Sequence, residues 1–157
     1  MSTIRFTAMS TTLARHYQAG GVDANGQTPE THVSDGDGVP CRHCLRNVKA
    51  GDKYLVLSHR PFPAPQPYAE TGPIFLHADA CERHKETAEM PAMFRETSDY
   101  ILRGYSDQDR IVYGTGGVIS TSDIPARAEE LLRRADVAYV HMRSARNNCF
   151  QCRIDLA

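Results

Sequence analysis

Cysteine and histidine residues gather between positions 41 and 84 in a spacing that suits a metal ion. Cys41 and Cys44 are separated by two residues, and a second group, containing His77, Cys81 and His84, follows further along the chain. Two cysteines at this separation can direct both sulfurs at one ion across a tight turn, and a second Cys/His pair can complete a tetrahedron. Because thiolate and imidazole ligands suit zinc, the sequence predicts a zinc site.

Three of the four zinc ligands follow directly from this spacing, whereas the fourth is a choice between two histidines. His77 is expected at the end of a short strand, four positions before Cys81. His84 lies three positions after Cys81, about one helical turn, so its ring could instead lie on the helix surface. We favour His77, and the predicted metal ligands are therefore Cys41, Cys44, His77 and Cys81.

Two other interpretations of the first cysteine pair stay open. A redox dithiol is one, because Arg42 and His43 place cationic groups beside the Cys41 and Cys44 thiols and would lower their pKa. Ordinary buried cysteines are the other, since free cysteine often packs as a small apolar residue. The zinc interpretation is favoured over both because a third cysteine and two histidines lie at suitable positions.

The same site could be catalytic if one coordination position on the metal ion were not filled by a side chain. If only three side chains held the ion, a water in the fourth position could be activated by the metal as a Lewis acid, and Asp79 or Glu70 would be the candidate acid/base. Zinc deaminases read His-x-Glu and then Pro-Cys-x-x-Cys, whereas here Pro40-Cys-Arg-His-Cys44 precedes His77-Ala-Asp79. The reversed order and the shorter acid argue against a deaminase, which leaves a zinc-dependent hydrolase as the enzymatic alternative.

The composition is that of an ordinary globular chain. Its 157 residues, 41% of them hydrophobic, are enough for one core, so we predict a single domain over residues 1–157. Nineteen acidic and 18 basic residues give a formal charge of -1, which is no strong signal for nucleic acid or an anionic membrane. No apolar run approaches the roughly twenty residues that span a bilayer. Five cysteines, an odd number, fit reduced thiols in a cytoplasm better than a disulfide framework.

Alternating apolar residues and turn signals divide the chain into short elements. Strands are predicted over residues 3–8, 54–57, 74–76, 100–105, 111–120, 137–143 and 149–156, and helices over 11–19, 80–89 and 124–135. The stretch 20–39, rich in Gly, Asp and Asn, has no apolar periodicity and is predicted to be a loop, as is the proline-rich stretch 61–67. These patterns indicate an α+β fold, a mostly antiparallel sheet with a few short helices.

The metal-binding segment is predicted to span residues 40–90 within this fold. Cys41 and Cys44 are expected on a knuckle that leads into a hairpin, and Asp79 is expected to cap the helix that carries Cys81. A knuckle, a hairpin and a helix in this order are typical of a treble-clef-like zinc module.

A second cysteine pair near the C-terminus is not expected to bind metal. Cys149 and Cys152 fall in a predicted strand, where residues three apart project to opposite faces. His141, between Val140 and Met142 of the partner strand, is predicted to be a structural histidine of the sheet.

Several segments of the chain together resemble a known protein family. They run from Pro40 to Leu45, from Gly72 to Cys81, from Val137 to Arg143 and from Cys149 to Asp155. In combination they resemble DUF1203, a bacterial family of unknown function, from about residue 40 to the end of the chain. The resemblance implies a small stand-alone bacterial protein and no particular activity. The matching segments contain the four favoured ligands, while His84 falls just beyond them, which supports the choice of His77.

The function that these observations favour is non-catalytic. A site with four protein ligands is closed to substrate, and the rest of the chain offers no reaction-specific motif. We therefore expect a cytoplasmic module, stabilised by structural zinc, that binds a protein or another macromolecule. A zinc-dependent hydrolase and a thiol redox protein are the alternatives.

Overall fold

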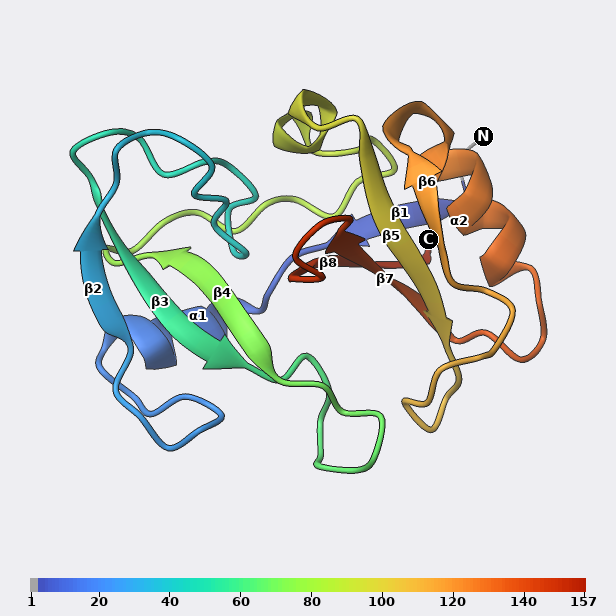
Figure 1. Cartoon of the computed structure of the whole chain (residues 1–157), viewed down its shortest axis with the longest axis horizontal. Helices are drawn as coiled ribbons and strands as arrows, with labels where there is room; N and C mark the ends of the chain where they lie inside the picture. The colour runs from blue at the N-terminus through green and yellow to red at the C-terminus, as the bar shows by residue number, and fades with distance from the viewer. Residues whose placement is uncertain (1–2) are drawn as a thin grey trace.

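Two antiparallel sheets, each with its own hydrophobic core, make up the computed structural model, which describes residues 3–157 (Figure 1). The strands are β1 (Ile4–Thr7), β2 (Glu30–Val33), β3 (Lys53–His59), β4 (Gly72–His77), β5 (Asp99–Tyr105), β6 (Gly117–Ser120), β7 (Tyr139–Ser144) and β8 (Phe150–Leu156). The helices are α1 (Thr11–Gln18) and α2 (Ile124–Leu132), with short 3-10 helices η1 (Ala92–Glu96) and η2 (Thr121–Asp123). The predicted α+β class, with mostly antiparallel sheet and few short helices, is confirmed.

The larger sheet has the strand order β1-β8-β7-β5-β6, and α2 covers one of its faces. Alternation places Leu102, Val140 and Met142 on that face, where they are fully buried. They pack against the apolar stripe of α2, which includes Ile124 and Leu131. The helix and the hairpin of β7 and β8 were both predicted from this periodicity, and both are confirmed.

The opposite face of the larger sheet is turned toward the three-stranded sheet and carries aromatic and polar side chains. Tyr105 and Tyr139 stack here with ring centroids 5.4 Å apart. Phe62, from the proline-rich loop between β3 and β4, packs on Tyr105 and on His141. This loop therefore covers part of the face that α2 leaves open.

The smaller sheet has the order β2-β3-β4, and α1 packs with it. The Ser10 hydroxyl accepts a hydrogen bond from the Leu13 backbone N–H, which caps the predicted helix α1. Ala14 and Tyr17 on the helix join Leu57 of β3 in the core of this sheet. The same core contains Cys41 and Cys44, so the predicted metal segment belongs to this half of the protein.

One strand lies where a loop was predicted. Residues 20–39 include β2, which pairs antiparallel with β3 from Glu30 opposite Val56 to Val33 opposite Lys53. All four β2 residues are exposed, because the strand lies at the sheet edge. Exposed edge residues need no apolar alternation, and the periodicity that identifies half-buried strands is therefore absent.

The helix predicted over residues 80–89 was wrong, because the backbone there is bonded to other parts of the chain. The Cys81 carbonyl accepts a hydrogen bond from Arg15, and the His84 N–H donates to the His43 carbonyl. Thr87 forms a bridge with Phe6 of β1. Because residues 80–89 form no helix, the structure does not show the treble-clef-like arrangement that was predicted for residues 40–90.

The strand predicted over residues 111–120 is shorter than expected, since β6 covers only its last four residues. The preceding residues turn, with Gly114 at a φ of 89° and Thr115 fully buried beneath β5. Across residues 3–157, no helix is long and apolar enough to cross a membrane.

Candidate metal centre

Four side chains from three segments converge beside the smaller sheet. Cys41 and Cys44 lie in the turn before β3, His77 is the last residue of β4, and Cys81 lies in the irregular segment that follows. Their ligand atoms all lie within 4.8 Å of one another. The structure thus brings together all four of the predicted ligands, close enough to bind one metal ion.

Two of the distances inside this group can be compared with the edges of a tetrahedral zinc site. The Sγ atoms of Cys41 and Cys81 are 3.9 Å apart, and Sγ of Cys44 lies 3.4 Å from Nδ1 of His77. Zn–S bonds of about 2.3 Å and Zn–N bonds of about 2.0–2.1 Å give tetrahedral edges of about 3.8 Å for two sulfurs and about 3.6 Å for sulfur and nitrogen. These two distances therefore lie within a few tenths of an ångström of the tetrahedral edges, and all other pairs of ligand atoms lie within 4.8 Å.

A tight turn holds the first two sulfurs in place. The Cys41 N–H donates to the Arg46 carbonyl, and the Leu45 N–H donates back to the Cys41 carbonyl, both at 3.0 Å. Leu45 takes up a left-handed φ of 54°, which lets the chain reverse directly after Cys44. The Arg42 N–H donates to the Phe75 carbonyl of β4, so the knuckle is fastened beside the strand that ends in His77.

A second histidine, His43, contacts the group of four without belonging to it. His43 is fully buried, with Nδ1 3.1 Å from Cys81 Sγ and Nε2 2.9 Å from the Thr11 hydroxyl. When Cys81 is a thiolate, as metal binding would require, it can only accept; the proton then lies on Nδ1, and Nε2 accepts from the Thr11 hydroxyl. The His77 backbone N–H similarly donates to Cys41 Sγ at 3.3 Å. Such outer contacts orient metal ligands and stabilise their charged form.

The role of His43 was missed at the sequence level, where it was considered only as a cation beside the Cys41 and Cys44 thiols. Burial lowers the pKa of His43, so the ring is neutral near pH 7. Its partners are 38 and 32 positions away along the chain, and no local pattern connects them.

Hydrogen bonds among the closely spaced thiols shift the pKa values of the candidate ligands in opposite directions. Hydrogen bonding from the Cys44 side chain holds the pKa of Cys41 far below its usual range. The hydrogen bond with Cys41 raises the pKa of Cys81 above its usual range and raises the pKa of His77 to about 10. Negative charge is thus favoured at Cys41 over Cys81. A divalent cation would remove this competition, because it allows all three cysteines to ionise together.

The rival ligand and the rival catalytic acids lie outside this group. His84 lines a cavity of about 640 Å³ onto which Cys44, His77 and Cys81 also open, but it does not belong to the group of four. Asp79 is exposed, and its carbonyl accepts a hydrogen bond from Gln18. Glu70 lies near Arg103 and Arg143 instead. The structure therefore places neither proposed acid in the cavity beside the candidate metal centre.

The C-terminal cysteines also stay apart from the centre, as predicted. Cys152 is buried in the core beneath α2, whereas Cys149 is partly exposed in the turn before β8. The two thiols therefore do not share a site.

Comparison with known proteins identifies a family but no characterised relative. No curated protein and no solved structure matches the chain significantly. A family model described as "Protein of unknown function (DUF1203)" matches residues 38–155, a range that includes Cys41, Cys44, His77 and Cys81. This match confirms the resemblance noted in the sequence, and the chain therefore belongs to the DUF1203 family.

Proposed function

We propose that Cys41, Cys44, His77 and Cys81 bind one zinc ion whose role is structural. Three sulfurs and one imidazole nitrogen are the donors that zinc favours in structural sites, and four donors fill a tetrahedral ion. The observation that carries the proposal is the agreement between the two ligand distances, 3.9 Å and 3.4 Å, and the edges of a zinc tetrahedron.

Burial and connectivity support a structural role over a catalytic one. Cys41 is fully buried and Cys44 is 8% exposed, so half of the ligand set is withdrawn from solvent. The ligands come from the knuckle, from the end of β4 and from the irregular segment after it. An ion bound by all four would join three segments that share few backbone hydrogen bonds, which is how structural zinc contributes to folding.

X-ray absorption at the zinc edge of the purified, zinc-loaded protein tests this proposal. We expect about one zinc per chain, with three sulfurs at about 2.3 Å and one nitrogen at about 2.0–2.1 Å. A coordination shell with one sulfur fewer and a water oxygen would instead support a zinc-dependent hydrolase. A folded protein that takes up no metal would contradict the zinc proposal altogether.

For the cellular role, we propose that the zinc-stabilised half binds another macromolecule, most simply a protein that adds a strand to β2. All four β2 residues are exposed, among them the apolar side chain of Val33, which is 63% exposed. An edge strand leaves one row of backbone N–H and C=O groups free to pair with a partner. The metal centre supports this edge, because β4, which ends in His77, belongs to the same sheet.

A photo-crosslinking residue tests the binding role when placed at Val33. The matched position is Val22, which is also exposed but precedes the sheet. Crosslinking to one macromolecule from Val33 and not from Val22 is the expected result, and chelation of zinc should weaken it. Equal crosslinking from both positions, or none from either, would contradict a partner at the β2 edge.

A further inference from the structure

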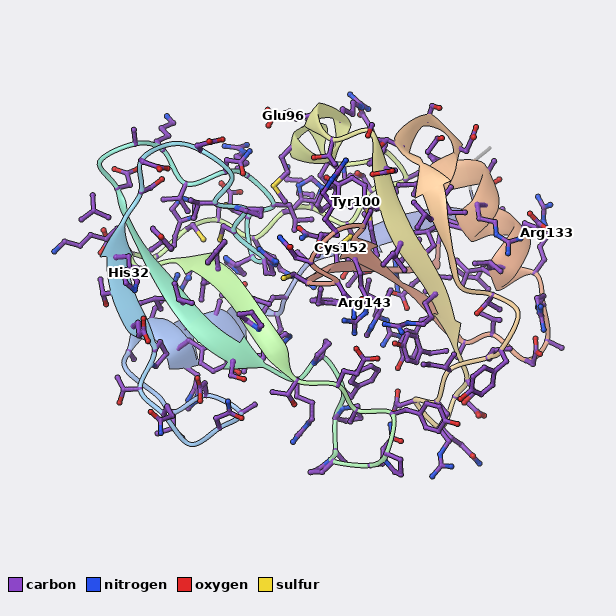
Figure 2. All side chains as sticks on the ribbon, in the orientation of Figure 1. His32, Glu96, Tyr100, Arg133, Arg143 and Cys152 are labelled. Atoms are coloured by element: carbon purple, nitrogen blue, oxygen red, sulfur yellow. The ribbon has the colours of Figure 1, made fainter. Side chains whose placement is uncertain are left out.

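A pair of arginines lies between the two sheets, far from the cysteines of the metal centre. Arg103 on β5 and Arg143 on β7 occupy the face of the larger sheet that is turned away from α2 (Figure 2 labels Arg143). Their side chains are 18% and 4% exposed, respectively. Burial of two guanidinium groups on one face is costly unless anionic or acceptor groups surround them.

The acceptors present around these arginines are too few. Glu70 lies 3.4 Å from Nη1 of Arg103 and 3.6 Å from Nη1 of Arg143, and the Asn148 carbonyl accepts from Arg143 Nη1 at 3.2 Å. The Nε and Nη2 atoms of both arginines are buried and have no hydrogen-bond partner within residues 3–157. Buried charged donors without acceptors are rare in native proteins, and an ion or ligand is a standard explanation for them.

Glu70 itself is a loose counterion. Its distances to the two arginines exceed the roughly 2.7–2.9 Å of a charge-assisted hydrogen bond. Its side chain is also 40% exposed and comes from the proline-rich loop, so it can turn toward solvent without disturbing a core. A second carboxylate or phosphate could therefore replace it on the guanidinium group of Arg143.

Two buried histidines stand beside the arginines and add no positive charge. Burial lowers the pKa of His59 to about 4 and holds the pKa of His141 well below its usual range, with Arg143 a further cause for both. The Nδ1 atoms of both rings lack a partner, as does the Tyr105 hydroxyl. Both rings are therefore neutral groups beside the arginines, and His59 also lines an adjacent cavity, where its Nδ1 could donate to an anion in one of the two tautomers.

A cavity of about 480 Å³ reaches Arg143 and His59 from the surface, whereas Arg103, Tyr105 and His141 lie outside its lining. Its lining includes Arg143, His59, Glu70, Phe150 and Cys149. The volume lies within the range of sites for small molecules. The cavity is formed by residues of both sheets, and sites between packed layers or domains are common places for ligands.

We propose that this cavity binds a small oxyanion, a carboxylate or a phosphate group, through the guanidinium group of Arg143, and that Glu70, which also pairs with Arg103, is the internal anion that it displaces. A planar guanidinium presents paired N–H donors that match both of these groups, and the free Nε and Nη2 of Arg143 form such a pair. This inference is independent of the zinc proposal, since none of its residues is a candidate metal ligand.

Binding of inorganic phosphate and of succinate to the full-length protein tests the proposal, with sodium chloride at matched ionic strength as the reference. Dissociation constants are measured by calorimetry for wild type, Glu70→Gln and Arg143→Lys. Arg133→Lys is the matched control, because Arg133 is 73% exposed at the end of α2 (Figure 2). Alkylation of Cys149 by iodoacetamide, mapped by mass spectrometry, provides a second measurement from inside the cavity.

At least one of the two probes should bind wild type and slow the alkylation of Cys149. Glu70→Gln should bind it about tenfold more tightly, since the competing carboxylate is gone, and Arg143→Lys about tenfold more weakly, since the paired donors are lost. Arg133→Lys should equal wild type. The stronger probe identifies the ligand as a phosphate or a carboxylate.

The proposal is overturned if neither probe exceeds chloride in wild type and in Glu70→Gln. It is also overturned if Glu70→Gln, whose side chain is at the surface, folds normally and binds no better than wild type. Equal affinity in Arg143→Lys and wild type would show that the anions bind elsewhere. If Arg143→Lys does not fold, the proposal is tested by the anion affinity of Glu70→Gln relative to wild type and by the rate of Cys149 alkylation with and without the anion.

Discussion

Replacing His43 tests whether the contacts around the metal ligands contribute to zinc affinity. Nδ1 of His43 lies 3.1 Å from Cys81 Sγ, to which it would donate once zinc makes Cys81 a thiolate, and Nε2 lies 2.9 Å from the Thr11 hydroxyl. In His43→Ala the Cys81 thiolate loses this donor, and no solvent replaces it readily because His43 is fully buried. Zinc affinity should therefore fall even though all four predicted ligands are retained.

The size of the loss follows from what such outer contacts contribute elsewhere. Removing a hydrogen-bond partner of a metal ligand costs about 10–100-fold in metal affinity, or about 1.4–2.7 kcal/mol. The His43–Cys81 contact should lie toward the upper end, since it is short, buried and directed at a charged sulfur. His43→Asn should recover most of the loss, because the Asn amide can place an N–H near the position of Nδ1.

Competition with a chromophoric chelator measures these affinities, and His16→Ala is the control. His16 is exposed on α1 and bonds to the Val22 carbonyl, away from the ligands. Wild-type affinity in His43→Ala would refute the reasoning, because the buried contact would then contribute nothing. Equal losses in the Ala and Asn variants would assign the effect to packing of the ring instead of to its hydrogen bond.

Further outcomes can be stated for the ligand choice, the thiols, the core and the pH dependence. His77→Ala should lose most of its zinc by elemental analysis, whereas His84→Ala should keep it; the reverse result would show that the wrong histidine was chosen. In the zinc-loaded protein Cys149 should be the thiol that reacts with a thiol probe, and the predicted ligand cysteines should react only after chelation; cycling of those cysteines with glutathione while zinc is bound would favour a redox protein. Leu102→Ala should lower the free energy of unfolding by about 2–5 kcal/mol in denaturant titrations, since Leu102 is fully buried. Burial lowers the pKa of His59 to about 4, so the unfolded chain binds more protons between that pH and about 6.5. Stability should therefore fall as the pH falls through this window, by about 3 kcal/mol more in wild type than in His59→Phe, and equal pH profiles would contradict it.

The sequence predicted elements well where a buried face imposed a period. The stripe of α2 and the alternation of β5, β7 and β8 follow from side chains that must reach one core, so their positions could be read from the apolar residues alone. β2 has no buried face, and its pairing with β3 depends on backbone groups that every residue carries. No side-chain pattern was therefore available to predict it.

The convergence of the four candidate ligands was predictable because spacing and chemistry agree, whereas their surroundings were not. Residues 80–89 carry a helix-like pattern, yet their backbone bonds go to Arg15, His43 and Phe6, which are distant in sequence. The same limit applies to the contact between His43 and Cys81. Glu70 was considered as an acid beside the metal from its position in the chain, but the fold carries its loop to the arginines of the other sheet.

The two candidate sites are connected through β4 and Arg42. β4 begins with Gly72 and Pro73 in the wall of the oxyanion cavity and ends with His77 at the metal centre. Arg42, between the knuckle cysteines, is buried and donates from Nε to the Phe150 carbonyl of β8 at 2.8 Å. The ring of Phe150 lines the same cavity. An ion that fixes the knuckle would therefore also fix Arg42 against the larger sheet, so a structural metal on one side of the protein would help to set the spacing of the sheets around the cavity on the other.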